Sequence, residues 1–174
     1  MLVLGFYFTS PPQIASVAGS CGGPPDPKEA EKAARESIRL QPTGYFWSYY
    51  QLAVSLRRQA RYPEAIAALE QTLQMNPAFR STYVGLGEAY LPQGSYRQAL
   101  AQFNKARGMG ETPGLLALIS AVYAARGDRE KSLAELDKAL ARGYRDFAYL
   151  DSSPYLAQVP TDARYQKLLR RYRK

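Results

Sequence analysis

The residue types that carry out most enzyme chemistry are scarce in this sequence of 174 residues. It contains no histidine, which excludes His-based general acid–base catalysis, the usual catalytic triads and most zinc sites. Its single cysteine, Cys21, excludes an intrachain disulfide and any site built from several cysteines. We therefore predict no catalytic residue, no metal site, no cofactor and no enzymatic activity.

The carboxylates and the glycines fit structural roles. The sequence has 15 Asp and Glu residues, and most stand close to Lys or Arg, as in "DREKSLAELDKAL". This pattern is typical of the solvated surface of a helix. The stretch "GMGETPG", residues 108–114, follows no predicted strand, so it indicates a connecting loop and not a loop that holds phosphate.

The sequence has more residues suited to protein binding than to catalysis. Trp47 and Tyr50 precede Arg57 within one apolar run, and Trp, Tyr and Arg are the residues that most often dominate the energy of protein interfaces. Whether they form one surface depends on the elements that carry them.

Those elements are predicted by a repeat. Residues 27–42, 62–77, 96–111 and 129–144 align without a gap, at steps of 35, 34 and 33 residues. A period in this range predicts stacked supersecondary units. In the second unit, one helix face carries Tyr49, Leu52, Ala53, Leu56 and Ala60, and a second amphipathic run carries Ala65, Ile66, Leu69 and Leu73. Pro63 suits the first turn of the second helix, and Asn76-Pro77 ends it.

The units resemble the tetratricopeptide repeat (TPR). Its pattern is matched most fully in the third unit, by Tyr83, Leu86, Gly87, Tyr90, Gly94, Ala99, Phe103 and Ala106. The resemblance implies an all-α fold, a right-handed solenoid of stacked antiparallel helix hairpins. The expected division is 1–26, a half repeat 27–42, repeats 43–77, 78–111 and 112–144, and a cap 145–174. The expected repeat core is Leu52, Ala65, Leu69, Leu86, Gly87, Tyr90, Ala99, Phe103, Tyr123 and Leu136.

The last unit of a solenoid needs a cap, because its apolar face has no neighbour. In residues 145–174, Asp162 is a predicted N-cap for a final helix. This segment also resembles the tail of bacterial TPR regulatory proteins. The residues predicted to dock on the fourth repeat are Phe147, Leu150, Tyr155 and Leu156, followed by Tyr165, Leu168 and Leu169 from the final helix.

Residues 1–26 leave three interpretations open. "AGSC" can end a lipoprotein signal with Cys21 as the acylated residue, but no Lys or Arg precedes Lys28. Alternatively, Ile14, Val17, Ala18 and Cys21 match the core positions of a degraded first TPR helix. The third interpretation is a disordered leader or a truncated start. A cytoplasmic location is favoured over an envelope lipoprotein, and no run is long enough to form a transmembrane helix.

In such a solenoid the first helix of each pair lines the concave surface. The predicted groove consists of Trp47, Tyr50, Val54 and Arg57, then Ser81, Val84 and Glu88, then Ala117, Ala121 and Ala124. In the alternative interpretation, Trp47 and Tyr50 pack against the preceding unit or the N-terminal segment.

We expect a scaffold that binds a peptide or helix of a partner protein in this groove. The alternatives are a regulatory module of a larger bacterial signalling protein and an envelope lipoprotein that assists assembly. The net charge of +8 is concentrated at the C-terminal end, where the segment Arg164–Lys174 holds six Lys and Arg. This basic tail is a weak candidate for binding nucleic acid, and the oligomeric state is not predicted.

Overall fold

The computed structural model describes residues 26–41, 45–156 and 162–173. Apart from one short 3₁₀ segment, η1 (Leu91–Gln93), the regular elements in these ranges are all α-helices. The predictions for Ile14, Val17, Ala18 and Cys21 lie outside the described residues. The helices are α1 (Pro27–Leu40), α2 (Phe46–Arg58), α3 (Tyr62–Met75), α4 (Arg80–Tyr90), α5 (Tyr96–Gly108), α6 (Pro113–Ala125), α7 (Arg129–Ala141), α8 (Phe147–Ser152) and α9 (Ala163–Tyr172).

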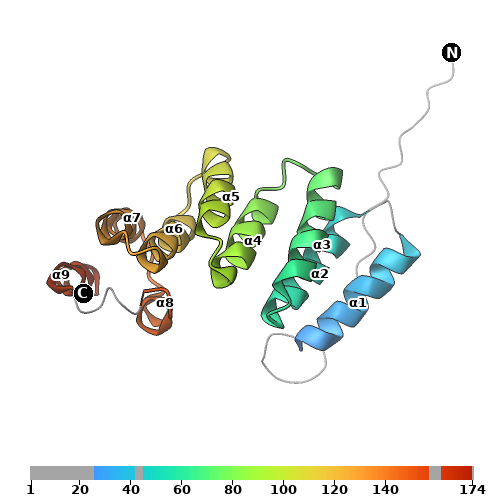
Figure 1. The fold of residues 1–174 in the computed structure, drawn as a ribbon, viewed down its shortest axis with the longest axis horizontal. Helices are drawn as coiled ribbons and strands as arrows, with labels where there is room; N and C mark the ends of the chain where they lie inside the picture. The colour runs from blue at the N-terminus through green and yellow to red at the C-terminus, as the bar shows by residue number, and fades with distance from the viewer. Residues whose placement is uncertain (1–25, 42–44, 157–161, 174) are drawn as a thin grey trace, which may run out of the picture.

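The helices pair in chain order and stack into a solenoid. Helices α2 and α3, α4 and α5, and α6 and α7 form the three hairpins, and α1 packs against α2. Each hairpin then contacts the next one, through α3 with α4 and α5 with α6. Figure 1 shows α1 and α9 at opposite ends of the row. The all-α fold of stacked hairpins predicted from the repeat is thereby confirmed.

The turns inside the hairpins follow the expected chemistry, with one exception. Gly94 and Gly127 adopt positive φ values of 70° and 86° at the turns before α5 and α7. Ala60 stands at the equivalent turn before α3 and has a φ of 58°. The prediction that Ala60 lies on the apolar face of the first helix is therefore wrong, because α2 ends at Arg58 and Ala60 is an exposed turn residue.

The core runs along the whole solenoid. Every residue predicted for the repeat core is buried, except Tyr90 and Tyr123, which are half-buried at its edge. The closest approach is at Gly87, where an added Cβ would lie 2.4 Å from Cε1 of Phe103. Small residues at such positions let the two helices of a hairpin pack closely.

The C-terminal segment covers the fourth repeat, as expected. Leu150, Leu156, Tyr165 and Leu169 are buried in the same cluster as Leu136 of α7. Asp162 caps α9, because its side chain accepts a hydrogen bond from the backbone N–H of Arg164 at 2.9 Å.

Ion pairs connect successive units. They join residues that are 28 to 34 positions apart, either in neighbouring hairpins or between a hairpin and α1 or α9. The pairs are Arg61–Glu31, Arg57–Glu88, Arg107–Glu135, Arg142–Glu111 and Arg164–Glu130.

Candidate interaction groove

Equivalent positions of the first helices form rows across the concave side. Phe46, Tyr50 and Val54 of α2 stand 34 positions before Arg80, Val84 and Glu88 of α4. The same step leads from Arg80 and Val84 to Gly114 and Leu118 of α6. Because the repeats stack in register, these residues face the same side of the solenoid.

The first part of this surface is an aromatic patch, formed by Phe46, Trp47, Tyr50 and Phe79. The Tyr50 and Phe79 ring centroids lie 5.1 Å apart at 82°, and those of Trp47 and Tyr50 lie 5.3 Å apart. Phe79 also contacts Phe46 at 5.1 Å and Trp47 at 5.9 Å. All four side chains are half-buried, so their rings pack together and still reach solvent.

A local turn places Phe79 in this patch. The side-chain carbonyl of Asn76 accepts a hydrogen bond from the backbone N–H of Ala78 at 3.2 Å, and Tyr83 donates its hydroxyl to the carbonyl of Pro77 at 2.9 Å. These bonds fix the connection between α3 and α4. Trp47 and Tyr50 thus contact the unit that follows them.

The second part is a cleft of about 370 Å³ between α4, α6 and the start of α8, called here the α4–α6–α8 cleft. Three of its polar residues are held by bonds within the protein: Arg80 donates to the carbonyl of Gly110 at 3.1 Å, Thr112 caps α6, and Asp146 caps α8. Its apolar and aromatic lining consists of Val84, Leu115, Leu118, Tyr144 and Tyr149.

A partly buried ion pair includes Glu88, which lines the cleft. The guanidinium of Arg57 contacts the carboxylate of Glu88, and both side chains are mostly buried. Burial lowers the pKa of Arg57 from its ordinary value. The pair joins α2 to α4, and the charges of Arg57 and Glu88 neutralise each other within the protein.

The tyrosines of the cleft stay neutral at physiological pH. Burial, with a smaller contribution from nearby Asp146, raises the pKa of Tyr144 to about 12. Burial also raises the pKa of Tyr149. Their hydroxyl groups therefore act as hydrogen-bond donors and acceptors and not as phenolates.

The residues predicted for the groove fall into two groups. Trp47, Tyr50, Val54, Arg57, Ser81, Val84 and Glu88 are all half-buried and belong to α2 and α4. The prediction for the fourth repeat is wrong: Ala117, Ala121 and Ala124 are at most 4% exposed. They belong to the buried core clusters, and Gly114 and Leu118 lie at the cleft in their place.

Sequence reasoning missed several residues of this surface, among them Phe46, Phe79, Leu118, Tyr144 and Tyr149. The sequence did contain a signal for Leu118, because this residue stands 34 positions after Val84, at the equivalent position of the next unit. The prediction used a step of 33 residues, which leads from Val84 to Ala117. Phe79 lies in a connection and Tyr144 and Tyr149 lie in the cap, where the repeat pattern assigns no position.

The tetratricopeptide repeat family matches residues 50–114, which carry α3, α4, α5 and most of α2. This part of the chain consists of tetratricopeptide repeats. Tetratricopeptide repeats are a scaffold for protein–protein interaction, and proteins of this family are generally not enzymes. No curated protein matches the sequence significantly.

Solved structures of TPR proteins share the fold. A thermophilic TPR protein from Thermus thermophilus has a TM-score of 0.64 and 21% identity, over 77% of this chain and 73% of that one. A crystal structure of MamA has a TM-score of 0.60 and 22% identity, over 67% of this chain and 68% of that one. A second MamA structure has a TM-score of 0.60 at 20% identity, over 73% and 68%.

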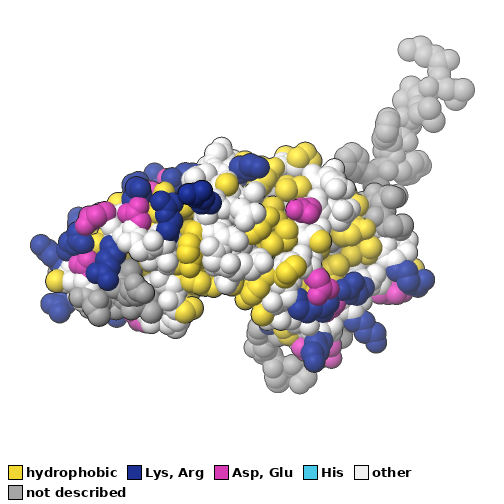
Figure 2. Space-filling model, viewed as in Figure 1, with side chains coloured by type: hydrophobic (Ala, Val, Ile, Leu, Met, Phe, Trp, Pro, Cys, Tyr) yellow, Lys and Arg dark blue, Asp and Glu magenta, His cyan; other side chains and the backbone are white. Residues whose placement is uncertain are grey.

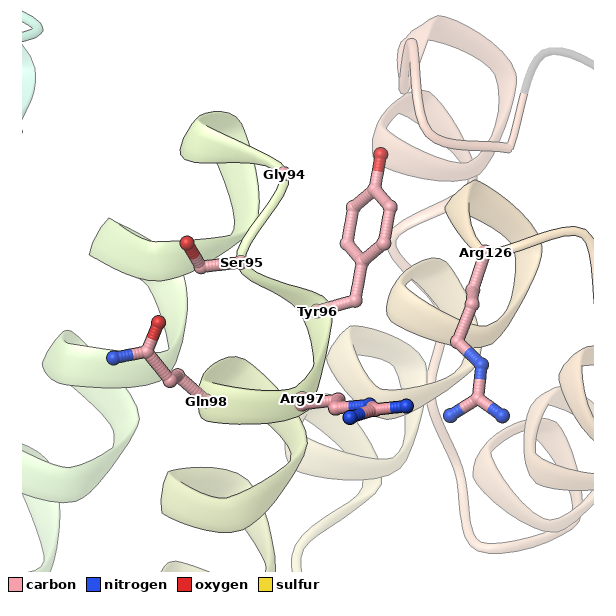
Figure 3. A pocket seen from close by; sticks show the side chains of 6 residues that line it. All are labelled: Gly94, Ser95, Tyr96, Arg97, Gln98 and Arg126. Atoms are coloured by element: carbon pink, nitrogen blue, oxygen red, sulfur yellow. The ribbon is translucent and has the colours of Figure 1, made fainter.

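A second cleft, of about 440 Å³, lies at the turn before α5 and the end of α6. In Figure 3 the side chains of Arg97 and Arg126 extend toward one another, whereas Gln98 points away from them. Its lining includes the two cations Arg97 and Arg126 and one aromatic residue, Tyr96, so it lacks an aromatic patch like that of the groove. Within the described residues, every helix is too short or too polar to cross a membrane, and no cluster of His, Cys, Asp and Glu could hold a metal ion.

Proposed function

We propose that this TPR protein captures a segment of a partner protein in the groove formed by the aromatic patch and the α4–α6–α8 cleft. The observation that carries the proposal is the position of half-buried aromatic rings next to an apolar cleft, on equivalent positions of successive first helices. Rings in this state bury large areas at little conformational cost when a partner covers them, which is how a few residues dominate an interface.

One face of the molecule shows a charge distribution that is typical of an interface. On the face shown in Figure 2, Lys and Arg gather toward the two ends, and the middle is mostly hydrophobic or uncharged. The core of a protein interface is typically poor in charged residues, while its rim is polar.

Peptide display tests the proposal directly. Random peptides are selected on the protein and then measured against Val84→Asp, which places a carboxylate in the cleft, and against Trp47→Ala with Tyr50→Ala. We expect each variant to weaken binding of the selected peptides by about tenfold or more, the loss typical of a hot-spot residue.

The matched control is Leu40→Ser on α1, because Leu40 is an exposed hydrophobic residue (65%) away from the groove. Its binding should equal that of the original protein. Circular dichroism of all variants checks that the helices persist. Selected peptides that bind Val84→Asp and the double variant at full strength would place recognition elsewhere and refute the groove.

A further inference from the structure

The cleft at the turn before α5 contains two arginines whose charges are not paired within the protein. Arg97 belongs to the first turn of α5, and Arg126 follows the last residue of α6. Both line the cleft of about 440 Å³, and Figure 3 shows their side chains extending toward one another. Among the described residues, neither guanidinium group forms an ion pair or a hydrogen bond. Two cations that converge without an acid between them favour an anion as ligand.

A change at one repeat position explains why these charges are unpaired. The second and fourth hairpins pair a cation with an acid at the start of the second helix. Arg61 contacts Glu64 at 2.5 Å beside α3, and Lys131 contacts Asp128 at 2.9 Å beside α7. The position of Glu64 is occupied by Gln98 in the third hairpin, 34 residues later, and the first turn of α5 contains no acid. The positive charge at this turn is therefore not neutralised by the protein.

The acid that acts on Arg126 is already bonded to another cation. Asp128 contacts the ammonium group of Lys131 and accepts a hydrogen bond from its backbone N–H at 3.3 Å. The pKa of Asp128 is lowered mainly by these bonds and only weakly by Arg126. Asp128 therefore leaves most of the charge of Arg126 uncompensated.

The number and type of the cations favour a phosphate monoester over a carboxylate. A phosphorylated side chain carries a charge of about −1.5 to −2 at pH 7 and offers three strong acceptor oxygens. A carboxylate carries a single charge. The planar guanidinium group presents a fork of N–H donors that matches two oxygens of a phosphate at once. Two guanidinium groups therefore balance the charge of one phosphate monoester, whereas one carboxylate would leave an excess of positive charge.

The form of the site favours a phosphorylated protein over a nucleic acid. Single-stranded nucleic acid is typically bound along a positively charged groove with several aromatic rings that stack on its bases. This cleft has two cations and one aromatic residue, Tyr96. Each phosphate of a nucleic acid backbone is also a diester, which carries a single charge.

We infer that the cleft of Arg97 and Arg126 binds a phosphorylated side chain of a partner protein. The two guanidinium groups donate hydrogen bonds to the phosphate oxygens. The residues that line this cleft and those that line the α4–α6–α8 cleft have no member in common. The inference therefore goes beyond the proposed function of the groove and does not depend on it.

A short phosphopeptide tests the inference. A capped glycine pentapeptide with phosphoserine at its centre and an uncharged fluorescent label is titrated with the full chain, and fluorescence anisotropy is followed. We expect a Kd on the order of 0.1 mM at about 0.05 M NaCl. The same peptide with serine or glutamate at its centre should bind at least about tenfold more weakly, because each lacks the second negative charge.

Variants of the two arginines make the test specific. Arg97→Gln with Arg126→Gln should weaken phosphopeptide binding about tenfold or more. The matched control, Lys28→Gln with Lys32→Gln, removes the same charge from exposed positions of α1 and should change Kd less than about twofold. Arg97→Lys with Arg126→Lys keeps the charge but loses the forks, so its Kd should rise about threefold. Circular dichroism checks that every variant keeps its helices.

A change of pH distinguishes a phosphate monoester from the other anions. The second pKa of phosphoserine is about 6, and the chain contains no histidine that would titrate in the same range. Lowering the pH from about 7.5 to about 5 adds a proton to the phosphate and should weaken phosphopeptide binding about fivefold. Binding of an eight-nucleotide thymidine strand, whose backbone phosphates are diesters, should not weaken in this range.

Four results would overturn the inference. Two of them are equal binding of the serine and phosphoserine peptides and equal losses in the arginine and lysine variants. The other two are tighter binding of the glutamate peptide or of the thymidine strand than of the phosphopeptide, since the ligand would then be a carboxylate or a nucleic acid. Trp47→Ala with Tyr50→Ala should bind the phosphopeptide as the original protein does, which separates this test from that of the groove.

Discussion

At the scale of single residues, Gly87 and Ala60 show two different reasons why a repeat position favours glycine. Gly87 faces the ring of Phe103 across the third hairpin with no room for a methyl group. Ala60, in contrast, is an alanine in the left-handed conformation that glycine adopts in the next two units. In the first case a larger residue clashes with its neighbour, and in the second the backbone itself is strained.

Gly87→Ala should lower the free energy of unfolding by about 1–3 kcal/mol, because the new methyl group overlaps the Phe103 ring. Urea unfolding followed by circular dichroism measures the change. The matched control is Gly108→Ala near the end of α5, where an added Cβ has nothing within 4 Å. That variant should be neutral or slightly stabilising, and equal losses at both positions would contradict the packing described for Gly87.

Ala60→Gly should raise the free energy of unfolding by about 0.5 kcal/mol. It removes the cost of a left-handed alanine, about 1–2 kcal/mol, and part of this gain is offset by the greater freedom of glycine in the unfolded chain. The reverse change, Gly94→Ala, should destabilise the protein. A thermal melt of both variants gives the comparison, and a lower melting temperature for Ala60→Gly would show that this turn is not strained.

At the scale of elements, the helices and their apolar faces follow from the periodicity of the sequence. Hairpin positions, the cap and most core residues could be predicted because helix packing is set by neighbours three and four apart. The groove-facing side of α6 could not be predicted, because a one-residue change in the repeat step decides whether Ala117 or Leu118 faces the groove. The loop residue Phe79 lies outside the repeat pattern, so its position in the groove could not be predicted from the sequence.

Helix α9 supports a prediction about pH. Hydrogen bonds from the side chain and the backbone of Arg164 lower the pKa of Asp162 from 3.8 to about 2. A carboxyl group with a lowered pKa in the folded state adds stability above its unfolded value and loses it as the pH falls toward the folded value. Asp162→Asn should therefore melt earlier than the original protein at pH 6.

The difference in melting temperature between Asp162→Asn and the original protein should shrink between about pH 4 and pH 2 and vanish below that range. Thermal melts at pH 6, 4 and 2 test this, with Glu70→Gln as the control because Glu70 is an exposed carboxylate on α3, away from α9. A difference that stays constant to pH 2 would mean that the charge of Asp162 does not stabilise α9.

At the scale of the whole molecule, the tetratricopeptide repeats account for the concave shape but not for where the groove ends. The repeat pattern predicts an open row of first helices, because each unit is treated alike. In the structure, α8 contributes Tyr149 to the cleft. The cap is thus part of the candidate site, which no pattern in the sequence of residues 145–174 indicates.

The ion pairs between successive units have a mechanical consequence. A stack of hairpins can twist and extend like a coil spring, since each unit touches only its neighbours. Cross-links such as Arg57–Glu88 and Arg107–Glu135 hold each unit at a fixed rotation relative to the next. A solenoid stiffened in this way keeps the same curvature when a partner binds. The binding surface is therefore preorganised, and little binding free energy is lost in deforming the protein.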